Sequence, residues 1–141
     1  MIDPALQARY DEWPQGPIGD LLGRRLLALD PAKGFARVAF EAIEDFCNPM
    51  GVVQGGFQMA MLDEAMTDAL LARTDWKFYP PTLEIKTSFF EPCRPGRVHA
   101  EGQVLKLGKS IAFLEGRLFE PGGALAAVAT CTVTLRPRAA K

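Results

Sequence analysis

The stretch from Phe46 to Arg73 limits the possible folds of this chain more than any other. A polar loop ends in Gly55 and Gly56, and the residues that follow contain no Gly or Pro and are rich in Ala, Leu and Met. These residue types favour helix, so the sequence predicts one helix of about four turns over residues 57–72. Because its apolar residues occur almost all round, this helix should be buried. Acidic residues in its middle are therefore anomalous, since burying an unpaired carboxylate is costly.

Alternating apolar and polar residues predict strands on both sides of this helix. Short turns join the later strands, which should therefore run antiparallel. A single apolar helix needs a sheet to cover it, which favours an α+β domain with one antiparallel sheet wrapped around a central helix. The segments in question are 25–29, 35–40, 82–90, 98–107, 110–119 and 126–135.

The length of 141 residues fits one domain over 1–141. We expect residues 1–23 to form an N-terminal extension, with a short helix over 4–13 capped by Asp3, and residues 136–141 to form a flexible, frayed tail. The net charge of −1 gives no indication of nucleic-acid or membrane binding. The three cysteines are far apart and predict neither a disulfide framework nor a metal site, and the chain shows no signal peptide or membrane span. A cytoplasmic location is the expectation.

The acidic residues of the central helix form two pairs. Asp63 and Thr67 are one turn apart and share a face, about 40° from each other. Glu64 and Asp68 form a second pair turned by about 100°, which we interpret as part of an exposed stripe. Asp63 has two interpretations: it belongs to the same solvated stripe, or it is a carboxylate held in an apolar pocket, with a raised pKa and stronger basicity.

The glycines before the helix also have two interpretations. Gly55 and Gly56 make a tight turn that needs positive φ, or they leave free helix amides that suit an anion or a polarised carbonyl oxygen. Asn48 and Gln54 add side-chain amides nearby, although Asn48 also fits ordinary turn chemistry. Gly55 and Asp63 are about 12 Å apart along a helix, too far for one reacting carbon to touch both. If both take part in catalysis, they must come from two subunits of an obligate dimer.

The pattern Asn48-x-x-Gly51-x-x-Gln54-Gly55-Gly56, followed by Asp63 and Thr67, resembles the hotdog-fold acyl-CoA thioesterases of the PaaI (phenylacetate-pathway) type. The resemblance covers residues 35–135, including 82–91, Pro95-Gly96, Gly108-Lys109 and 126–130. It implies a hotdog fold, a homodimer that assembles to a tetramer, and hydrolysis of an acyl-CoA thioester without a metal or redox cofactor.

The resemblance also implies roles for individual residues. Asp63 would act as general base or nucleophile, and the Gly55 N–H would polarise the thioester carbonyl. The remaining catalytic positions are Asn48, which places the carbonyl or the water, Thr67, which holds the water, and Thr82, near the leaving thiolate. Relatives usually carry His where this chain has Gln54, whose amide can donate a hydrogen bond but cannot take up a proton. An acyl-thioester-binding hotdog module without catalysis is therefore the alternative.

Coenzyme A requires cations for its phosphates. The candidate substrate-binding residues are Gly56, Arg94, Arg97, Lys106 and Lys109, although the four cations also fit ordinary turn charges. Phe57, Met61 and Met66 are candidates for an acyl pocket, or plain core, and their apolar character favours an aryl or medium-chain acyl group. The single histidine, His99, is interpreted as a solvated strand residue, which argues against histidine-dependent dehydratases and against a Ser-His-Asp hydrolase.

Overall fold

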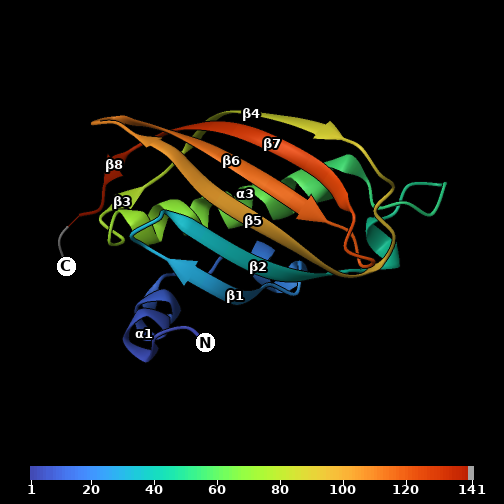
Figure 1. The fold of residues 1–141 in the computed structure, drawn as a ribbon, viewed down its shortest axis with the longest axis horizontal. Coiled ribbons are helices and arrows are strands. Elements are labelled where there is room, and N and C mark those ends of the chain that lie inside the picture. Colours follow the sequence, from blue (N-terminus) through green and yellow to red (C-terminus); the bar gives the residue numbers. More distant parts are fainter. Residues whose placement is uncertain (140–141) are drawn as a thin grey trace.

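Six antiparallel strands form one curved sheet around a long helix in the computed structural model, which describes residues 1–139 (Figure 1). The strand order is β1-β2-β5-β6-β7-β4, so β1 and β4 are the two edges. This is the hotdog arrangement, and the predicted fold class is confirmed. The elements are α3 (Gly55–Arg73), β1 (Arg25–Asp30), β2 (Phe35–Ala42), β4 (Thr82–Phe89), β5 (Gly96–Leu107), β6 (Ile111–Phe119) and β7 (Leu125–Thr134).

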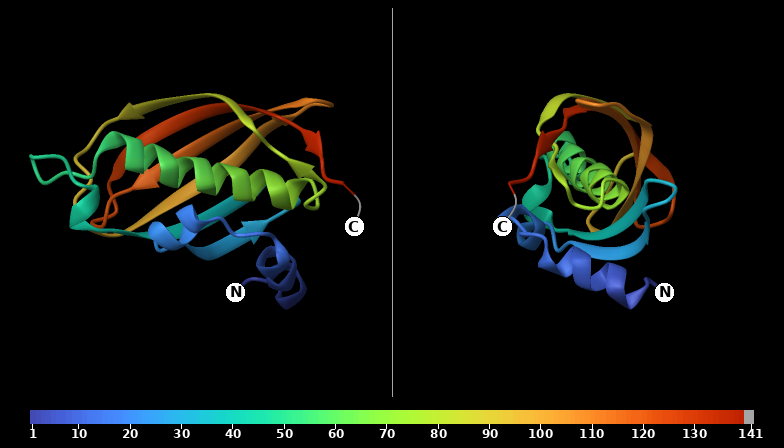
Figure 2. Two further views of the ribbon diagram at one scale, coloured as in Figure 1. Left: turned by 180° about the vertical axis from the view of Figure 1, so that it is seen from behind. Right: turned by 90° about the vertical axis from the view of Figure 1, so that its left-hand side faces the viewer.

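Helix α3 lies in the concave side of the sheet, as the end-on view in Figure 2 shows. Its sheet-facing residues Met61, Leu62 and Met66 are fully buried. The closest approach is to β5, where a Cβ atom added at Gly102 would lie 2.1 Å from the carbonyl oxygen of Ala65. The absence of a side chain at Gly102 therefore allows the helix backbone to rest directly on the middle of the sheet.

Two short helices precede the sheet, α1 (Pro4–Glu12) and α2 (Pro17–Leu21), and a 3₁₀ turn, η1 (Glu44–Phe46), follows β2. The predicted cap is confirmed, since Asp3 Oδ1 accepts hydrogen bonds from the first amides of α1. Helix α1 lies at the C-terminal end of α3 (Figure 2), where Tyr10 and Trp76 form a second, smaller core. Asp75 and Trp76 have positive φ, and burial of the Trp76 ring offsets the strain of that turn.

The prediction of a frayed tail from residue 136 is wrong for its first residues. Arg136–Pro137 forms β8, which pairs with β3 (Phe78–Tyr79), and the backbone N–H of Arg138 donates to the Lys77 carbonyl at 2.8 Å. A proline is tolerated because this ladder has only two strands and the residue lies on an edge. Residues 140–141 lie outside the described residues. No helix within residues 1–139 is long and apolar enough to cross a membrane.

Candidate active site

Asp63 is a half-buried carboxylate in the middle of α3, on the side that faces edge strand β4. Its Oδ1 accepts a hydrogen bond from Thr82 Oγ1 at 3.2 Å. Burial raises the pKa of Asp63 above its ordinary value, and the Thr82 hydrogen bond opposes that rise. No cation within residues 1–139 forms an ion pair with this carboxylate. Of the two sequence-based interpretations, the structure supports the partly desolvated carboxylate.

The N-terminal end of α3 presents free backbone amides. Gln54 is the N-cap residue, and its side chain makes no capping hydrogen bond. Gly55 and Gly56 are the first helical residues, so their N–H groups have no acceptor inside the helix and meet the positive end of the helix dipole. Neither glycine has positive φ, so the tight-turn interpretation is wrong. A side chain at Gly55 would instead displace the half-exposed Phe89 ring, because an added Cβ would lie 2.8 Å from it.

The loop before α3 is held by Asn48. Its Oδ1 accepts hydrogen bonds from the backbone N–H groups of Met50, at 2.9 Å, and Val52, at 3.3 Å. This is the turn chemistry that the sequence allowed, and it uses only the oxygen of the amide. The Nδ2 group has no acceptor within the described residues and remains able to donate to a ligand.

A groove of about 620 Å³ opens beside these amides. Of its ten lining residues, sequence reasoning identified only Asn48 and Gly55. Those it missed include Gln58, whose buried Oε1 has no hydrogen-bond donor in the described residues, and the half-exposed Phe89 and Phe90. Sequence reasoning did not predict that two adjacent Phe side chains at the end of a strand would both be exposed, because the alternating pattern does not extend beyond the strand. The lining comprises Asn48, Met50, Val52, Val53, Gly55, Gln58, Phe89, Phe90, Glu91 and Pro92.

The structure thus places the predicted catalytic residues in two separate groups within one protomer. Asn48 and Gly55 line the groove, whereas Asp63 and Thr82 meet about 12 Å further along α3 and are absent from that lining. Thr67 is half-buried one turn beyond Asp63 and makes no side-chain hydrogen bond within the described residues. Gln54 is exposed, with its Oε1 close to Gly56.

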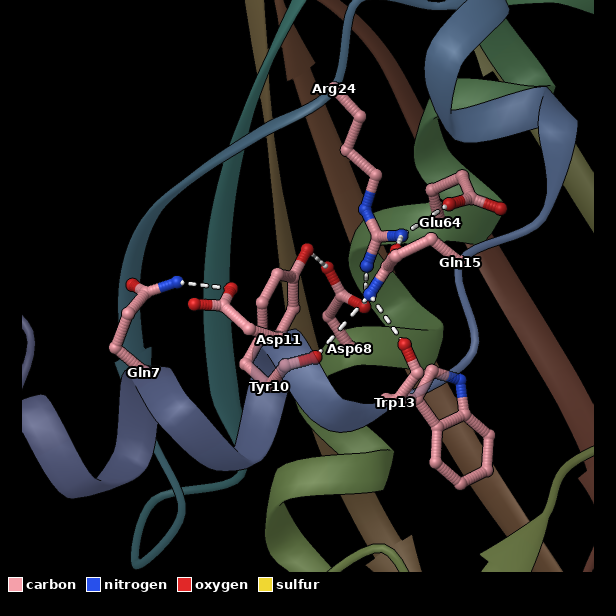
Figure 3. A network of polar contacts seen from close by, with 8 residues as sticks. All are labelled: Gln7, Tyr10, Asp11, Trp13, Gln15, Arg24, Glu64 and Asp68. Carbon is pink, nitrogen blue, oxygen red and sulfur yellow. Dashed lines mark hydrogen bonds and ion pairs between the residues drawn. The ribbon is translucent and has the colours of Figure 1, made fainter.

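Glu64 and Asp68 contradict the predicted exposed stripe (Figure 3). Asp68 is only 2% exposed, and its carboxylate binds the Arg24 guanidinium and accepts a hydrogen bond from Tyr10 Oη at 3.0 Å. Glu64 lies 3.2 Å from Arg24 Nη1. The correction has a simple cause: residues 10–24 of the N-terminal segment cover this face of α3 and bring a cation to it. Burial raises the pKa of Asp68, and Arg24 opposes that rise.

The four cations predicted for coenzyme A do not lie together in one protomer. Arg94 and Arg97 flank the start of β5, near the N-terminal end of α3, and Arg97 pairs with Glu41 at 2.9 Å. Lys106 and Lys109 lie at the opposite end of β5, beside the turn into β6.

Two of the candidate acyl-pocket residues belong to the core. Met61 and Met66 are fully buried within the protomer. Phe57 is half-buried and stacks on Phe46, with 4.3 Å between ring centroids. His99, interpreted as a solvated residue, instead stacks on Phe119 at 4.7 Å.

Known proteins with similar sequences and structures agree with this fold. Residues 50–127 match the thioesterase superfamily. A curated relative named as an esterase, from Saccharolobus solfataricus, is 34% identical over 98 residues, which cover 69% of each chain. A phenylacetic acid degradation-related protein from Ralstonia eutropha JMP134 has a TM-score of 0.83 at 28% identity, covering 91% of this chain and 96% of that chain.

A variant of the phenylacetic acid degradation protein PaaI from Thermus thermophilus has a TM-score of 0.74 at 30% identity, covering 86% of this chain and 99% of that chain. The family match includes the end of the Asn48 loop, all of α3 and the strands through β6. The chain therefore belongs to the thioesterase superfamily, with PaaI-like proteins among its structural relatives, and is a thioester hydrolase.

Proposed function

We propose that the protein hydrolyses acyl-CoA thioesters at sites shared between two protomers. The observation that carries this proposal is the position of Asp63: a half-buried carboxylate with a raised pKa lies on the same helix as the free Gly55 amide, about 12 Å away. A second protomer whose helix runs the other way would place its Gly55 opposite this Asp63, and its own Asp63 opposite this Gly55. One dimer would then contain two complete sites.

Strand β4 supports this arrangement. It is a sheet edge with unpaired backbone groups on one side, it carries Thr82, and it ends at Phe89 beside Gly55. Leu83, Phe89 and Phe90 on or next to this strand are at least half exposed, which is unusual for such large apolar side chains. Pairing of two β4 edges would cover them. Leu105 and Phe113 on the outer face of the sheet are also exposed and favour further assembly to a tetramer.

The proposed chemistry uses both groups of residues, Gly55 with Asn48 from one protomer and Asp63 with Thr82 from the other. The thioester carbonyl oxygen accepts a hydrogen bond from the Gly55 N–H, which stabilises the negative charge that develops there. The Asp63 carboxylate takes a proton from water as the water oxygen bonds to the carbonyl carbon. The C–S bond then breaks, and the departing thiolate receives that proton. Direct attack by Asp63 on the same carbon, followed by hydrolysis of the resulting anhydride, gives the same products.

Asn48 and Gln54 position the substrate in this scheme. The free Nδ2 group of Asn48 donates to the carbonyl or to the water, and Gln54 provides a neutral donor that does not titrate. The apolar wall of the groove, with Phe89 and Phe90, favours an aryl or medium-chain acyl group. The PaaI name of one relative points to the same kind of substrate. This scheme requires no metal or redox cofactor.

Release of free thiol from a panel of acyl-CoAs tests the proposal. Asp63→Asn should lower kcat by roughly 10²- to 10⁴-fold, because it removes the proton acceptor. Asp20→Asn, which removes an exposed carboxylate from α2, is the matched control and should retain activity. Solution sizing should give a dimer or a multiple of it. Equal activity of wild type and Asp63→Asn, or full activity of a monomer, would contradict the mechanism.

Gln54 gives the alternative function a specific basis, because a neutral amide stands where relatives carry a titratable histidine. If the protein binds acyl-CoA but releases no thiol above background from any member of the panel, it is a binding module.

A further inference from the structure

A second cavity, of about 610 Å³, lies at the C-terminal end of α3, away from the groove. Three segments that are distant in sequence enclose it: the end of α1, the turn after α3 and the residues after β8. We call it the basic cradle. Its lining comprises Arg9, Glu12, Trp13, Asp75, Trp76, Lys77, Arg138 and Ala139.

The basic cradle combines cations with flat aromatic surfaces. Arg138 lies over the Trp13 ring at 4.8 Å, and Arg9 lies over the Trp76 ring at 5.3 Å. The chain has two tryptophans, and both line this cavity. Such a combination suits a ligand with a planar base and phosphate groups. Trp76 is buried and an arginine lies over each ring, so the base would pack on the outer face of a guanidinium group, and the remaining cations would bind the phosphates.

The cations are available for an anionic ligand. Asp75 pairs with Arg9 at 3.0 Å and with Lys77 at 3.8 Å, but all three side chains are about half exposed or more. Exposed pairs of this kind are weak and exchange readily for a phosphate. Arg138 has no acidic partner within residues 1–139.

The basic cradle is also at a suitable distance from Asp63. Asp63 is hydrogen-bonded to Thr82, which is three residues from Tyr79, and the Tyr79 ring lies 5.2 Å from Trp13. Along α3, Asp63 is ten residues from the end of the helix at Arg73, which corresponds to about 15 Å. The arm of coenzyme A between the sulfur and the diphosphate has about the length of four residues of extended polypeptide, or about 14 Å.

We propose that the basic cradle binds the adenosine 3′,5′-bisphosphate end of the acyl-CoA whose thioester lies at Asp63 of the same protomer. This proposal rests on the proposed acyl-CoA hydrolysis. It assigns the nucleotide to Arg9, Lys77 and Arg138 rather than to Arg94 and Arg97, which lie at the other end of α3. It also gives the N-terminal extension a role in substrate binding, through Arg9 and Trp13.

The decisive variant is Arg138→Gln combined with Lys77→Gln, compared on an acyl-CoA and on the matching acyl-pantetheine, which lacks the nucleotide. Loss of charged hydrogen bonds to phosphate should raise KM for the acyl-CoA roughly tenfold or more and leave kcat unchanged. KM for the acyl-pantetheine should not change. Arg136→Gln removes a charge from β8 outside the lining of the cavity and controls for general electrostatics.

A second measurement does not depend on turnover. Adenosine 3′,5′-bisphosphate alone should quench the tryptophan fluorescence of the wild type with saturation, and the double variant should bind it roughly tenfold or more weakly. Absence of saturable quenching would overturn the proposal, as would a double variant whose KM is unchanged or rises equally for both substrates. An increase in KM with Arg94→Gln alone would place the nucleotide at the start of β5. If no acyl-CoA is hydrolysed but the bisphosphate still binds, the proposed hydrolysis is wrong, whereas the assignment of the basic cradle as a nucleotide-binding site is retained.

Discussion

Replacing Arg24 by Met tests the polar network between the N-terminal segment and α3. Arg24 is 9% exposed and Asp68 is 2% exposed, and the guanidinium also contacts Glu64. Arg24→Met keeps most of the apolar stem but removes the only cation that these two carboxylates contact within residues 1–139. Asp68 would keep one hydrogen bond, from Tyr10.

The expected loss of stability is large. Breaking a buried pair by removing one partner costs about 3–5 kcal/mol, because the remaining charge is buried without compensation. For a chain of this size, that loss lowers Tm by about 10–17 °C. Arg37→Met is the matched control: its partner Glu101 lies 2.6 Å away, but the Arg37 side chain is 45% exposed. Exposed pairs contribute about 0–1 kcal/mol, so the control should lose little.

The loss should depend on pH in a defined direction. Burial raises the pKa values of Asp68 and Glu64, and Arg24 opposes both rises. In the variant this opposition is gone, so both folded-state pKa values rise further above those of the unfolded chain. A carboxylate of this kind destabilises the fold above its folded pKa and ceases to do so as pH falls through that value. The difference between variant and wild type should therefore be largest at pH 7–8 and shrink toward pH 4.

Urea denaturation across that pH range measures both effects. Adding Asp68→Asn to Arg24→Met removes the buried charge and should recover part of the stability, since the amide still accepts from Tyr10. Two results would refute the reasoning: a loss at pH 7 no greater than that of Arg37→Met, or a loss that does not vary with pH.

Three further predictions concern the site and the packing of α3. Thr82→Val removes the hydrogen bond that holds down the pKa of Asp63, so the acid limb of the kcat/KM profile should move to higher pH; an unmoved limb would contradict this. Gly102→Ala places a Cβ 2.1 Å from the Ala65 carbonyl oxygen and should destabilise the fold by about 3 kcal/mol in chemical denaturation, whereas Gly16→Ala, with its nearest neighbour at 3.8 Å, should be close to neutral. Gln54→His introduces a group that titrates near pH 6.5, so the pH–rate profile should gain an inflection there that the wild type lacks.

The fold could be predicted from the sequence because its signals are local. Alternation identified the six main strands, and an apolar run without Gly or Pro identified α3, to within two residues at each end. The pairing of β8 with β3 was missed, since a two-residue ladder has no periodicity to detect. The exposure of Phe89 and Phe90 was missed for a related reason: alternation gives the two faces of a strand, but it does not give the geometry where the strand ends.

The four acidic and hydroxyl residues of α3 show where prediction of the site succeeds and where it ends. Asp63 could be singled out from the sequence because it lies on a helix that is apolar almost all round, where an unpaired carboxylate is costly to bury. Asp68 satisfies the same criterion more strongly, yet its partner Arg24 is 44 residues earlier in the chain, and no periodicity connects the two. Buried acids therefore divide into those that a distant cation neutralises and those that remain available for chemistry, and only the structure separates them. Asp68 has its cation, whereas Asp63 has only a neutral hydroxyl, that of Thr82. This difference is the reason for proposing Asp63, and not Asp68, as the proton acceptor.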